Sequence, residues 1–177
     1  MIETPRLKLR EWRAEDREPF YRMSSDPLVM RYFPGCLTRE ESDGLADRIE
    51  RHFAIHRFGL WAAEVRETGE FAGFIGLWVP AFPARFMPCV EIGWRLGPAW
   101  WNRGLATEGA RAAMAFGFDE LQLDEIVSFT VPANLPSRRV MEKLGMRYEP
   151  ADDFDHPRIP EGHPLRRHVL YRKRRGG

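Results

Sequence analysis

Residues 97–118, GPAWWNRGLATEGARAAMAFGF, constrain the fold of this chain more than any other segment. Before them, apolar side chains occupy every second position from 90 to 96, which predicts a β-strand with two different faces. After a turn over 97–103, small and apolar residues return at helical spacing: Leu105, Gly109, Ala112, Ala113 and Phe116. We therefore expect a strand, a glycine-containing turn, and a helix from near Gly104 to near Phe118 that lies flat on a sheet.

The start of this helix is suited to binding an anion. The first backbone N–H groups of a helix lack internal partners and lie at the positive end of its dipole. Gly104 lets an anion approach the backbone without an intervening Cβ, Ala106 keeps the neighbouring wall small, and Arg103 adds a positive charge. An ordinary turn capped by glycine is the alternative, because short glycine patterns recur by chance.

Two common nucleotide-binding motifs fail in this segment. Gly104 and Gly109 have the P-loop spacing, but the Lys and the Ser or Thr that should follow are replaced by Ala110 and Arg111. The dinucleotide fingerprint needs a ribose-binding acid at the carboxyl end of a strand, whereas Asp124 stands at the beginning of one. The motifs therefore argue against a nucleotide-dependent enzyme.

Three stretches resemble the GNAT superfamily of acetyl-CoA-dependent N-acetyltransferases: EIGWRLGPAWWNRGLATEGA, NLPSRRVMEKLGM and TPRLKLREWRAED. Within that superfamily, the chain is similar to the branch that acetylates the N-termini of ribosomal proteins. The family's pyrophosphate signature is met from Trp101 to Ala106, with Trp101 in place of the usual Gln or Arg. The resemblance implies a single-domain α/β fold. It consists of a twisted, mixed, mostly antiparallel sheet with helices on both faces, splayed into a V between the central parallel strands ending at Leu96 and Val131.

The resemblance also implies which residues hold acetyl-CoA, the co-substrate. They lie on the strand before the turn, in the turn and first helix, and at the start of a second helix: Trp94, Leu96, Asn102, Arg103, Gly104, Leu105, Ala106, Thr107, Asn134 and Ser137. Asn134 also suits the ordinary role of an N-cap, and the two roles are compatible. Arg138 and Arg139 are either solvated or placed against the 3′-phosphate of CoA.

Acetyl transfer to an amine requires removal of a proton, because a primary amine is mostly protonated at pH 7. Glu91 is the first candidate for the base, since it precedes the turn on the strand face opposite the apolar residues, next to Gly93. Glu64 is the second candidate, and ordered water is the main alternative to both. Many family members protonate the CoA thiolate with a Tyr where this chain has Met141, which leaves Ser137 or water as the acid.

The bulk composition indicates one domain of balanced charge. A chain of 177 residues with 44% apolar content can bury one sizeable core but not two. The net charge of +1 and the pI near 7.9 give no pull toward nucleic acid or a membrane surface, so we expect neither as a partner. Cys36 and Cys89 define no disulfide framework, and the charged N-terminus is unlike a secretion signal, which favours the cytoplasm.

The remaining elements are expected in mixed α/β order. Strands are expected at these ranges: 6–12, which we place at a sheet edge because one face is charged, 59–66, 70–79, 125–131, 146–149 and 168–173. Helices are expected at 15–24, from a Thr38–Glu41 capping box to His56, and at 135–144. The segment 150–165 is expected to be a loop.

No metal site is expected. His52 and His56 have zinc-ligand spacing but lack the Glu of an HExxH motif, so we interpret them as structural. The loop after residue 150 carries acids and histidines at irregular spacing, which favours a solvated loop: Asp152, Asp153, Asp155, His156 and His163.

The sequence therefore predicts acetyl transfer from acetyl-CoA to a primary amine, on a protein N-terminus or a small molecule, by direct attack in a ternary complex. The alternative is a non-catalytic module of the same fold that binds or senses acyl-CoA. A covalent route through Cys89 has no local base to support it. Four aromatic residues either line the acceptor pocket or belong to the core: Trp61, Trp78, Phe82 and Phe86. The resemblance makes a homodimer plausible.

Overall fold

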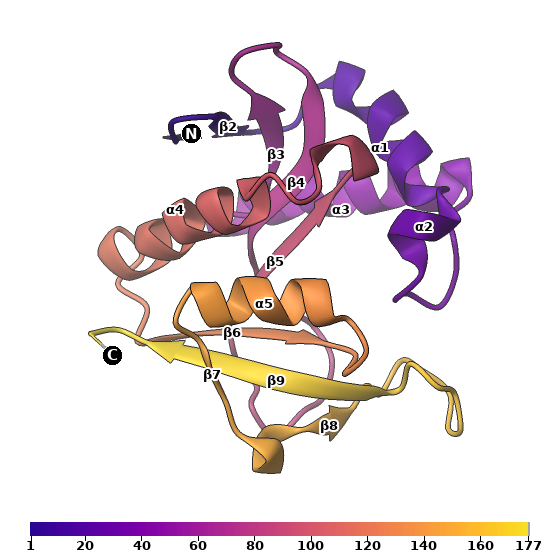
Figure 1. Cartoon of the computed structure of the whole chain (residues 1–177), viewed down its shortest axis with the longest axis vertical. Coiled ribbons are helices and arrows are strands. Elements are labelled where there is room, and N and C mark those ends of the chain that lie inside the picture. Colours follow the sequence, from indigo (N-terminus) through magenta and orange to yellow (C-terminus); the bar gives the residue numbers. More distant parts are fainter. Residues whose placement is uncertain (177) are drawn as a thin grey trace.

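The structure is a computed structural model and describes residues 1–176. Within these residues the strands form one sheet in the order β1-β2-β3-β4-β5-β6-β9-β7, and β8 pairs with β9 (Figure 1). The strands are β1 (Ile2–Glu3), β2 (Leu7–Arg10), β3 (Leu60–Val65), β4 (Phe71–Trp78), β5 (Glu91–Leu96), β6 (Glu125–Thr130), β7 (Arg147–Tyr148), β8 (Phe154–Asp155) and β9 (Arg167–Arg174). All neighbouring strands are antiparallel except β5 and β6, which are parallel, so the expected mixed sheet is confirmed.

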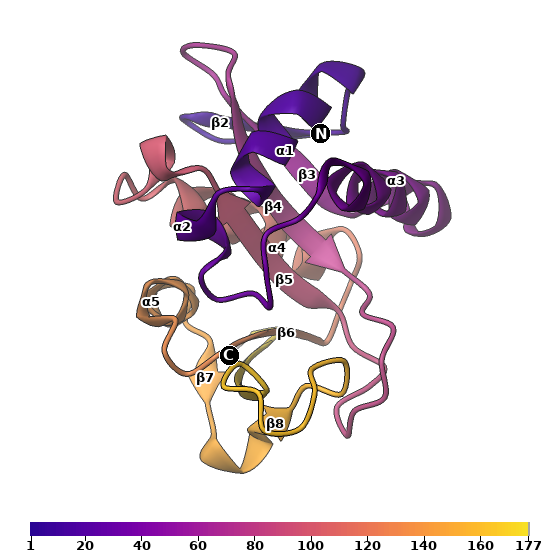
Figure 2. The ribbon, with the colours of Figure 1, turned by 90° about the vertical axis from the view of Figure 1, so that its right-hand side faces the viewer.

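Helices cover both faces of the sheet, as the two ribbon views show (Figures 1 and 2). They are η1 (Ala14–Asp16), α1 (Arg17–Ser24), α2 (Pro27–Met30), α3 (Arg39–His56), η2 (Pro98–Trp100), α4 (Leu105–Asp119), α5 (Leu135–Lys143) and η3 (Pro150–Asp152). On one face, Phe20 of α1 and Ala46 of α3 share a core with Phe74 of β4. On the other face, Ala113 of α4 and Met141 of α5 belong to the main core. No helix in the described part of the chain is both long enough and apolar enough to cross a bilayer.

Small residues allow α4 to lie directly on the sheet. A Cβ atom at Gly109 would come within 2.5 Å of Ile75 Cδ1, and one at Gly117 within 2.7 Å of Ile126 Cδ1. Ala113, between these two glycines, is fully buried. Leu105, Gly109 and Ala113 of the predicted stripe are buried as expected. Ala112 and Phe116 are only half-buried, and the buried face is completed by Ala110, Met114 and Gly117 instead. Side chains larger than the two glycines would push the helix off the sheet.

The two parallel strands pair only at their beginnings. Among the described residues, Glu91 opposite Val127 is the one ladder pair that joins β5 to β6. Two further bonds lie beside it, from Val127 N to Val90 O and from Ser128 Oγ to Ile92 O, each 2.9 Å. Beyond Ile92 the strands separate toward their carboxyl ends, which is the V that the sequence resemblance predicted.

Two expectations about secondary structure were wrong. The strand β2 is not at the edge of the sheet, because the two-residue strand β1 pairs along it, and its Arg10 side chain is buried among carboxylates instead of facing solvent. The segment 150–165 is not entirely a loop, since β8 adds Phe154 opposite His168 of β9. Strands as short as β1 and β8 contain too few residues to show an alternating pattern.

Candidate active site

The turn between β5 and α4 leaves backbone amides free at the start of the helix. Asn102 and Gly104 both have left-handed backbone conformations, with φ angles of 57° and 78°. Within residues 1–176, the N–H groups of Leu105, Ala106 and Thr107 find no acceptor, and Gly104 supplies no side-chain cap. These three free amides lie at the positive end of the α4 dipole, and free amides at a helix N-terminus are an arrangement that binds phosphate.

The side chain of Trp101 holds this turn in place. Its indole Nε1 donates a 2.7 Å hydrogen bond to the carbonyl oxygen of Leu96, at the end of β5. The guanidinium of Arg31 lies over its ring at 5.8 Å, and that of Arg103 lies over the ring of Trp100 at 5.3 Å. Trp101, which stands where the family signature has Gln or Arg, therefore makes its hydrogen bond within the turn. In the described chain it leaves the backbone amides of Leu105, Ala106 and Thr107 free.

The N-terminal segment is tied to the first turn of α4 through Glu108. Thr4 Oγ1 donates to Glu108 Oε1 at 2.7 Å, and Arg6 Nε donates to Glu108 Oε2 at 2.7 Å. Arg6 Nη1 also donates to the carbonyl oxygen of Arg103 at 2.8 Å. Burial alone would raise the pKa of Glu108, but these hydrogen bonds outweigh burial and lower it. No local sequence pattern indicates this contact, because its partners are about a hundred positions apart.

The separated part of β5 presents free backbone groups to the V. Backbone groups of a strand alternate in direction, and the carbonyl of Ile92 points toward β6, where it accepts the Ser128 hydroxyl. The backbone groups of Trp94 and Leu96 therefore point the same way. Apart from the Leu96 carbonyl, which accepts the Trp101 indole, they have no partner in the described chain. A ligand with amide groups can bind this open edge as an additional strand does.

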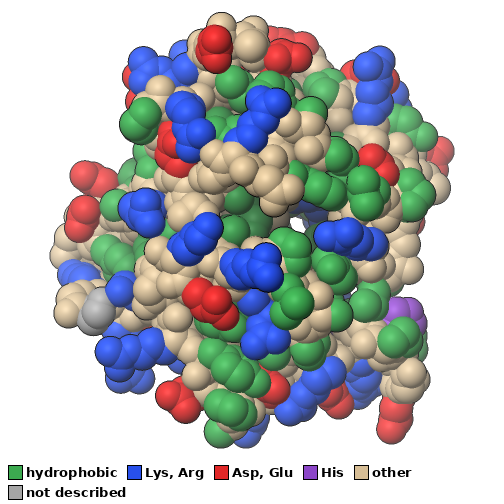
Figure 3. Space-filling model, viewed as in Figure 1, with side chains coloured by type: hydrophobic (Ala, Val, Ile, Leu, Met, Phe, Trp, Pro, Cys, Tyr) green, Lys and Arg blue, Asp and Glu red, His purple; other side chains and the backbone are tan. Residues whose placement is uncertain are grey.

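The surface is hollowed at the V. The space-filling view shows an opening near its centre, between the two halves of the molecule (Figure 3). Apolar side chains line it, and several Lys and Arg side chains lie around it. A basic rim around an apolar passage suits a ligand that combines phosphates with an uncharged arm.

Glu91 is a carboxyl group without a partner at the base of the V. It begins β5 and faces away from α4, because Ile92 beside it is fully buried in the core under α4. Within residues 1–176 its carboxyl group has no hydrogen bond or ion pair, and burial raises its pKa to about 8. Such a group changes protonation near neutral pH, as a general base must.

Glu64, the second candidate for the base, is excluded by its partners. Its Oε2 accepts hydrogen bonds from Arg10 Nε at 2.6 Å and from Arg13 Nη1 at 3.4 Å. Both guanidinium groups occupy this carboxylate, so it is not free to face an acceptor amine. Sequence alone could not separate Glu64 from Glu91, since their difference lies in their tertiary contacts.

Asn134 and Ser137 lie beyond the end of β6, where α5 begins. Asn134 Oδ1 caps the helix by accepting from Ser137 N at 3.3 Å, and its Nδ2 donates to Thr130 Oγ1 at 3.0 Å. The Ser137 hydroxyl makes no hydrogen bond within the described chain. Met141 is buried in the core, so this position offers neither a hydroxyl nor a path to the V. Arg138 bonds the Tyr171 hydroxyl at 3.1 Å and is thereby held against β9.

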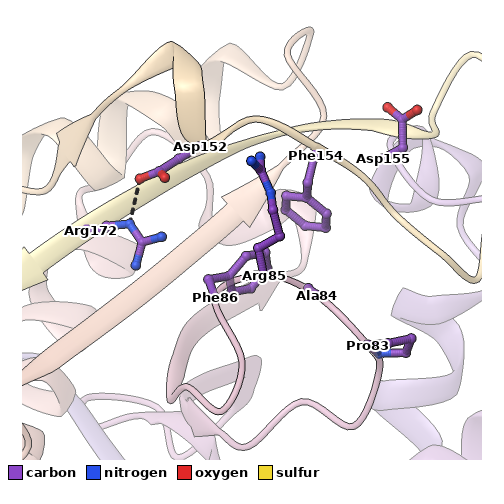
Figure 4. A pocket seen from close by; sticks show the side chains of 8 residues that line it. All are labelled: Pro83, Ala84, Arg85, Phe86, Asp152, Phe154, Asp155 and Arg172. Atoms are coloured by element: carbon purple, nitrogen blue, oxygen red, sulfur yellow. Dashed lines mark hydrogen bonds and ion pairs between the residues drawn. The ribbon is translucent and has the colours of Figure 1, made fainter.

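The aromatic candidates divide between the core and a second pocket. Trp61 is buried under α4, and Trp78 stacks on His52. Phe82 and Phe86 pack with Phe154, beside a pocket of about 300 Å³ (Figure 4). The residues lining this pocket are Pro83, Ala84, Arg85, Phe86, Asp152, Phe154, Asp155 and Arg172. None of them comes from the splayed part of β5 or from the turn between β5 and α4, so this pocket is separate from the V.

The His52–His56 pair is structural. The N–H of Val79 donates to His52 Nε2 at 3.0 Å, so the proton of the neutral ring is on Nδ1, which lies 2.8 Å from the Phe58 carbonyl. Both ring nitrogens are therefore occupied, and burial lowers the pKa of His52. No group of three or more His, Cys, Asp or Glu residues within 1–176 is arranged to hold a metal ion.

Residues 6–147 match the sequence model of the Acetyltransferase (GNAT) domain. The chain belongs to this family. A Bacillus subtilis protein named as an uncharacterized N-acetyltransferase, YnaD, is 33% identical over 162 residues, which cover 91% of this chain and 89% of YnaD. A GNAT-family acetyltransferase of Bacillus anthracis has the same fold, with a TM-score of 0.80, 30% identity, and coverage of 98% of this chain and 97% of that one.

Other GNAT structures share the fold at lower identity. Mycobacterium smegmatis RimJ, solved in complex with CoA-disulfide, has a TM-score of 0.75 and 20% identity over 96% of this chain and 82% of its own. The family, the fold and the enzyme class, an N-acetyltransferase, are thus those that the sequence resemblance predicted.

Proposed function

We propose that this GNAT enzyme transfers the acetyl group of acetyl-CoA to a primary amine by direct attack, with both substrates bound together. The observation that supports this most is on β5. This strand turns free backbone groups toward the V, carries an unpartnered carboxyl group at its base, and ends at the open amides of α4. One strand thus brings together a phosphate site, an edge for the pantetheine arm and a proton acceptor.

The proposed binding of acetyl-CoA uses backbone more than side chains. The pyrophosphate binds the amides of Leu105, Ala106 and Thr107, in the turn formed by Asn102 and Gly104, with Arg103 adding charge. The amide groups of the pantetheine arm bind the free backbone edge of β5, at Trp94 and Leu96. On the other arm of the V, the N-terminus of α5 contributes Asn134 and Ser137.

In the proposed reaction, Glu91 takes a proton from the acceptor ammonium, directly or through water. The neutral amine attacks the thioester carbonyl, and the new C–N bond forms as the C–S bond breaks. The nitrogen then loses its second proton, which passes to the CoA thiolate through the Ser137 hydroxyl or through water, so that the amide and free CoA thiol are released. Direct attack is favoured over an acyl-cysteine intermediate, because burial raises the pKa of the Cys89 thiol to about 12 and keeps it protonated.

The test of this proposal is release of CoA thiol from acetyl-CoA in the presence of different amines. The panel comprises short peptides with free N-termini, polyamines, amino acids and aminoglycosides. We expect thiol release with one class of amine, and mass spectrometry should then detect the acetylated form of that amine. The opposite outcome is that acetyl-CoA raises the melting temperature but no amine in the panel is acetylated. That result would support a non-catalytic acyl-CoA-binding module.

A further inference from the structure

The guanidinium group of Arg95 lies on the face of the sheet opposite α4, and no carboxylate in the described chain forms an ion pair with it. Its Nη1 donates only a long hydrogen bond, 3.4 Å, to Ser24 Oγ. Its Nε is buried and has no hydrogen-bond partner. No Asp or Glu of residues 1–176 forms an ion pair with it. Burial lowers its pKa to about 10, so at neutral pH it remains a charged group that lacks compensation.

Two aromatic rings hold the Arg95 guanidinium. Its Cζ lies 4.3 Å from the ring centre of Phe33, in the chain after α2, and 5.3 Å from that of Phe74, on β4. These cation–π contacts supply part of the missing attraction and fix the orientation of the group. They do not satisfy its N–H donors, which point along the guanidinium plane and remain suited to a planar anion.

Arg95 shares its strand face with Glu91. Side chains alternate along β5, so Glu91, Gly93 and Arg95 all face away from α4. The space above Gly93 is open, because a Cβ atom there would meet only Leu60 Cδ2 at 3.9 Å. A ligand can therefore lie across Gly93, between the carboxyl group of Glu91 and the guanidinium group of Arg95.

We propose that Arg95 binds a carboxylate of the acceptor, so that the substrate is a primary amine carrying a carboxylate several bonds away. This inference rests on the proposed acetyl transfer, since Glu91 then receives the amine end. The four-residue spacing separates the two Cα atoms by about 13 Å. Since both side chains stand on the same face, their ends are separated by a distance on the order of 10 Å, which an amine and a carboxylate joined by a chain of the length of 6-aminohexanoate or lysine can bridge with a hydrogen bond at each end.

The test compares acceptors that differ only in the carboxylate. The first pair is 6-aminohexanoate and 1-aminohexane, and the second is a C-terminally amidated peptide Ala-Glu-Ala and its Ala-Gln-Ala counterpart. The first pair represents a small amino acid and the second an acidic peptide N-terminus. We expect the wild type to favour the carboxylate-bearing member of one pair by roughly 10- to 100-fold in KM.

Two variants assign that preference to Arg95. Arg95→Met should abolish the preference by raising KM for the carboxylate-bearing acceptor alone, and Arg95→Lys should restore part of it. Melting temperatures report whether each variant is folded. Equal KM values for both members of each pair in the wild type would overturn the inference. So would an Arg95→Met variant that loses acetyl-CoA affinity to the same extent, because Arg95 would then serve the CoA phosphates.

Binding measured without turnover separates this inference from the proposed function. The melting shift produced by 6-aminohexanoate on the protein with bound CoA is compared with that produced by 1-aminohexane. An Arg95-dependent shift without any acetylation would contradict acetyl transfer to these amines and still support the carboxylate site. Acetylation of both amines with equal KM values would support the proposed acetyl transfer and contradict the carboxylate site at Arg95.

Discussion

The sheet contains two arginines whose surroundings are opposite in kind. Arg10, on β2, forms hydrogen bonds with both oxygens of Asp16, at 2.7 and 2.8 Å, and with Glu64 at 2.6 Å. Arg95, on β5, has one long contact to a hydroxyl. The acids show the same contrast, since Glu64 is paired and Glu91 is not. The fold thus pairs its charged side chains in the β2–β3 region and leaves two ionisable side chains, Glu91 and Arg95, without an ion-pair partner in the described chain, on the face where substrates are proposed to bind.

Removing Arg10 should have the largest effect on stability. Arg10→Met leaves Asp16, which is 1% exposed, and Glu64 without their main partner, so we expect a loss of about 3–5 kcal/mol in the free energy of unfolding. Urea denaturation measures this change. Arg13→Met is the matched control, because its half-exposed side chain reaches Glu64 only at 3.4 Å and should cost about 1 kcal/mol or less. Equal losses in the two variants would contradict the contrast between the regions.

Glu91 should make stability depend on pH, with an intermediate effect. Its pKa is raised from 4.5 to about 8 in the folded protein, so between these values the folded state holds a proton that the unfolded state releases. Stability should therefore fall as pH rises from about 5 to 8. Glu91→Gln removes this dependence and should be more stable than wild type at pH 8 by on the order of 2–4 kcal/mol.

The measurement is denaturant unfolding at several pH values. Glu70→Gln, on the exposed β3–β4 hairpin, is the control and should follow the wild-type curve. A difference between Glu91→Gln and wild type that stays constant from pH 5 to pH 8 would mean that Glu91 is not held in its protonated form by burial.

Removing Arg95 should have the smallest effect on the fold. No carboxylate depends on it, and a methionine side chain can occupy the space between Phe33 and Phe74. We therefore expect Arg95→Met to change the free energy of unfolding by less than about 1 kcal/mol in either direction. A loss as large as that of Arg10→Met in the same urea experiment would show that Arg95 serves the fold and not a ligand.

The local elements of the site could be predicted from the sequence. The strand before Gly97, the turn and the small-residue stripe of α4 are encoded by residues that are neighbours in the chain. The strand and the turn were found as predicted, and the stripe was found with its centre shifted toward Ala110 and Gly117. The V itself was predicted from the family resemblance, since no periodicity reports where two parallel strands separate.

The long-range contacts could not be predicted. Glu64 and Glu91 both stand on strands, and only the fold shows that Arg10 neutralises one of them. Arg95 occupies one of the polar positions of the alternating strand, and its place on the same face as Glu91 and Gly93 was the available signal for a role in the site. The contact of Glu108 with Arg6, like the two-residue strands β1 and β8, depends on tertiary packing alone.

The most direct test of this account is the acetyl-transfer rate of Glu91→Gln measured beside that of Glu70→Gln, with acetyl-CoA affinity determined for both. We predict that Glu91→Gln lowers kcat by roughly 100-fold or more while its Kd for acetyl-CoA stays at the wild-type value, and that Glu70→Gln changes neither. Unchanged kcat in Glu91→Gln would contradict the claim that the unpartnered carboxyl group on β5 accepts the proton of the amine.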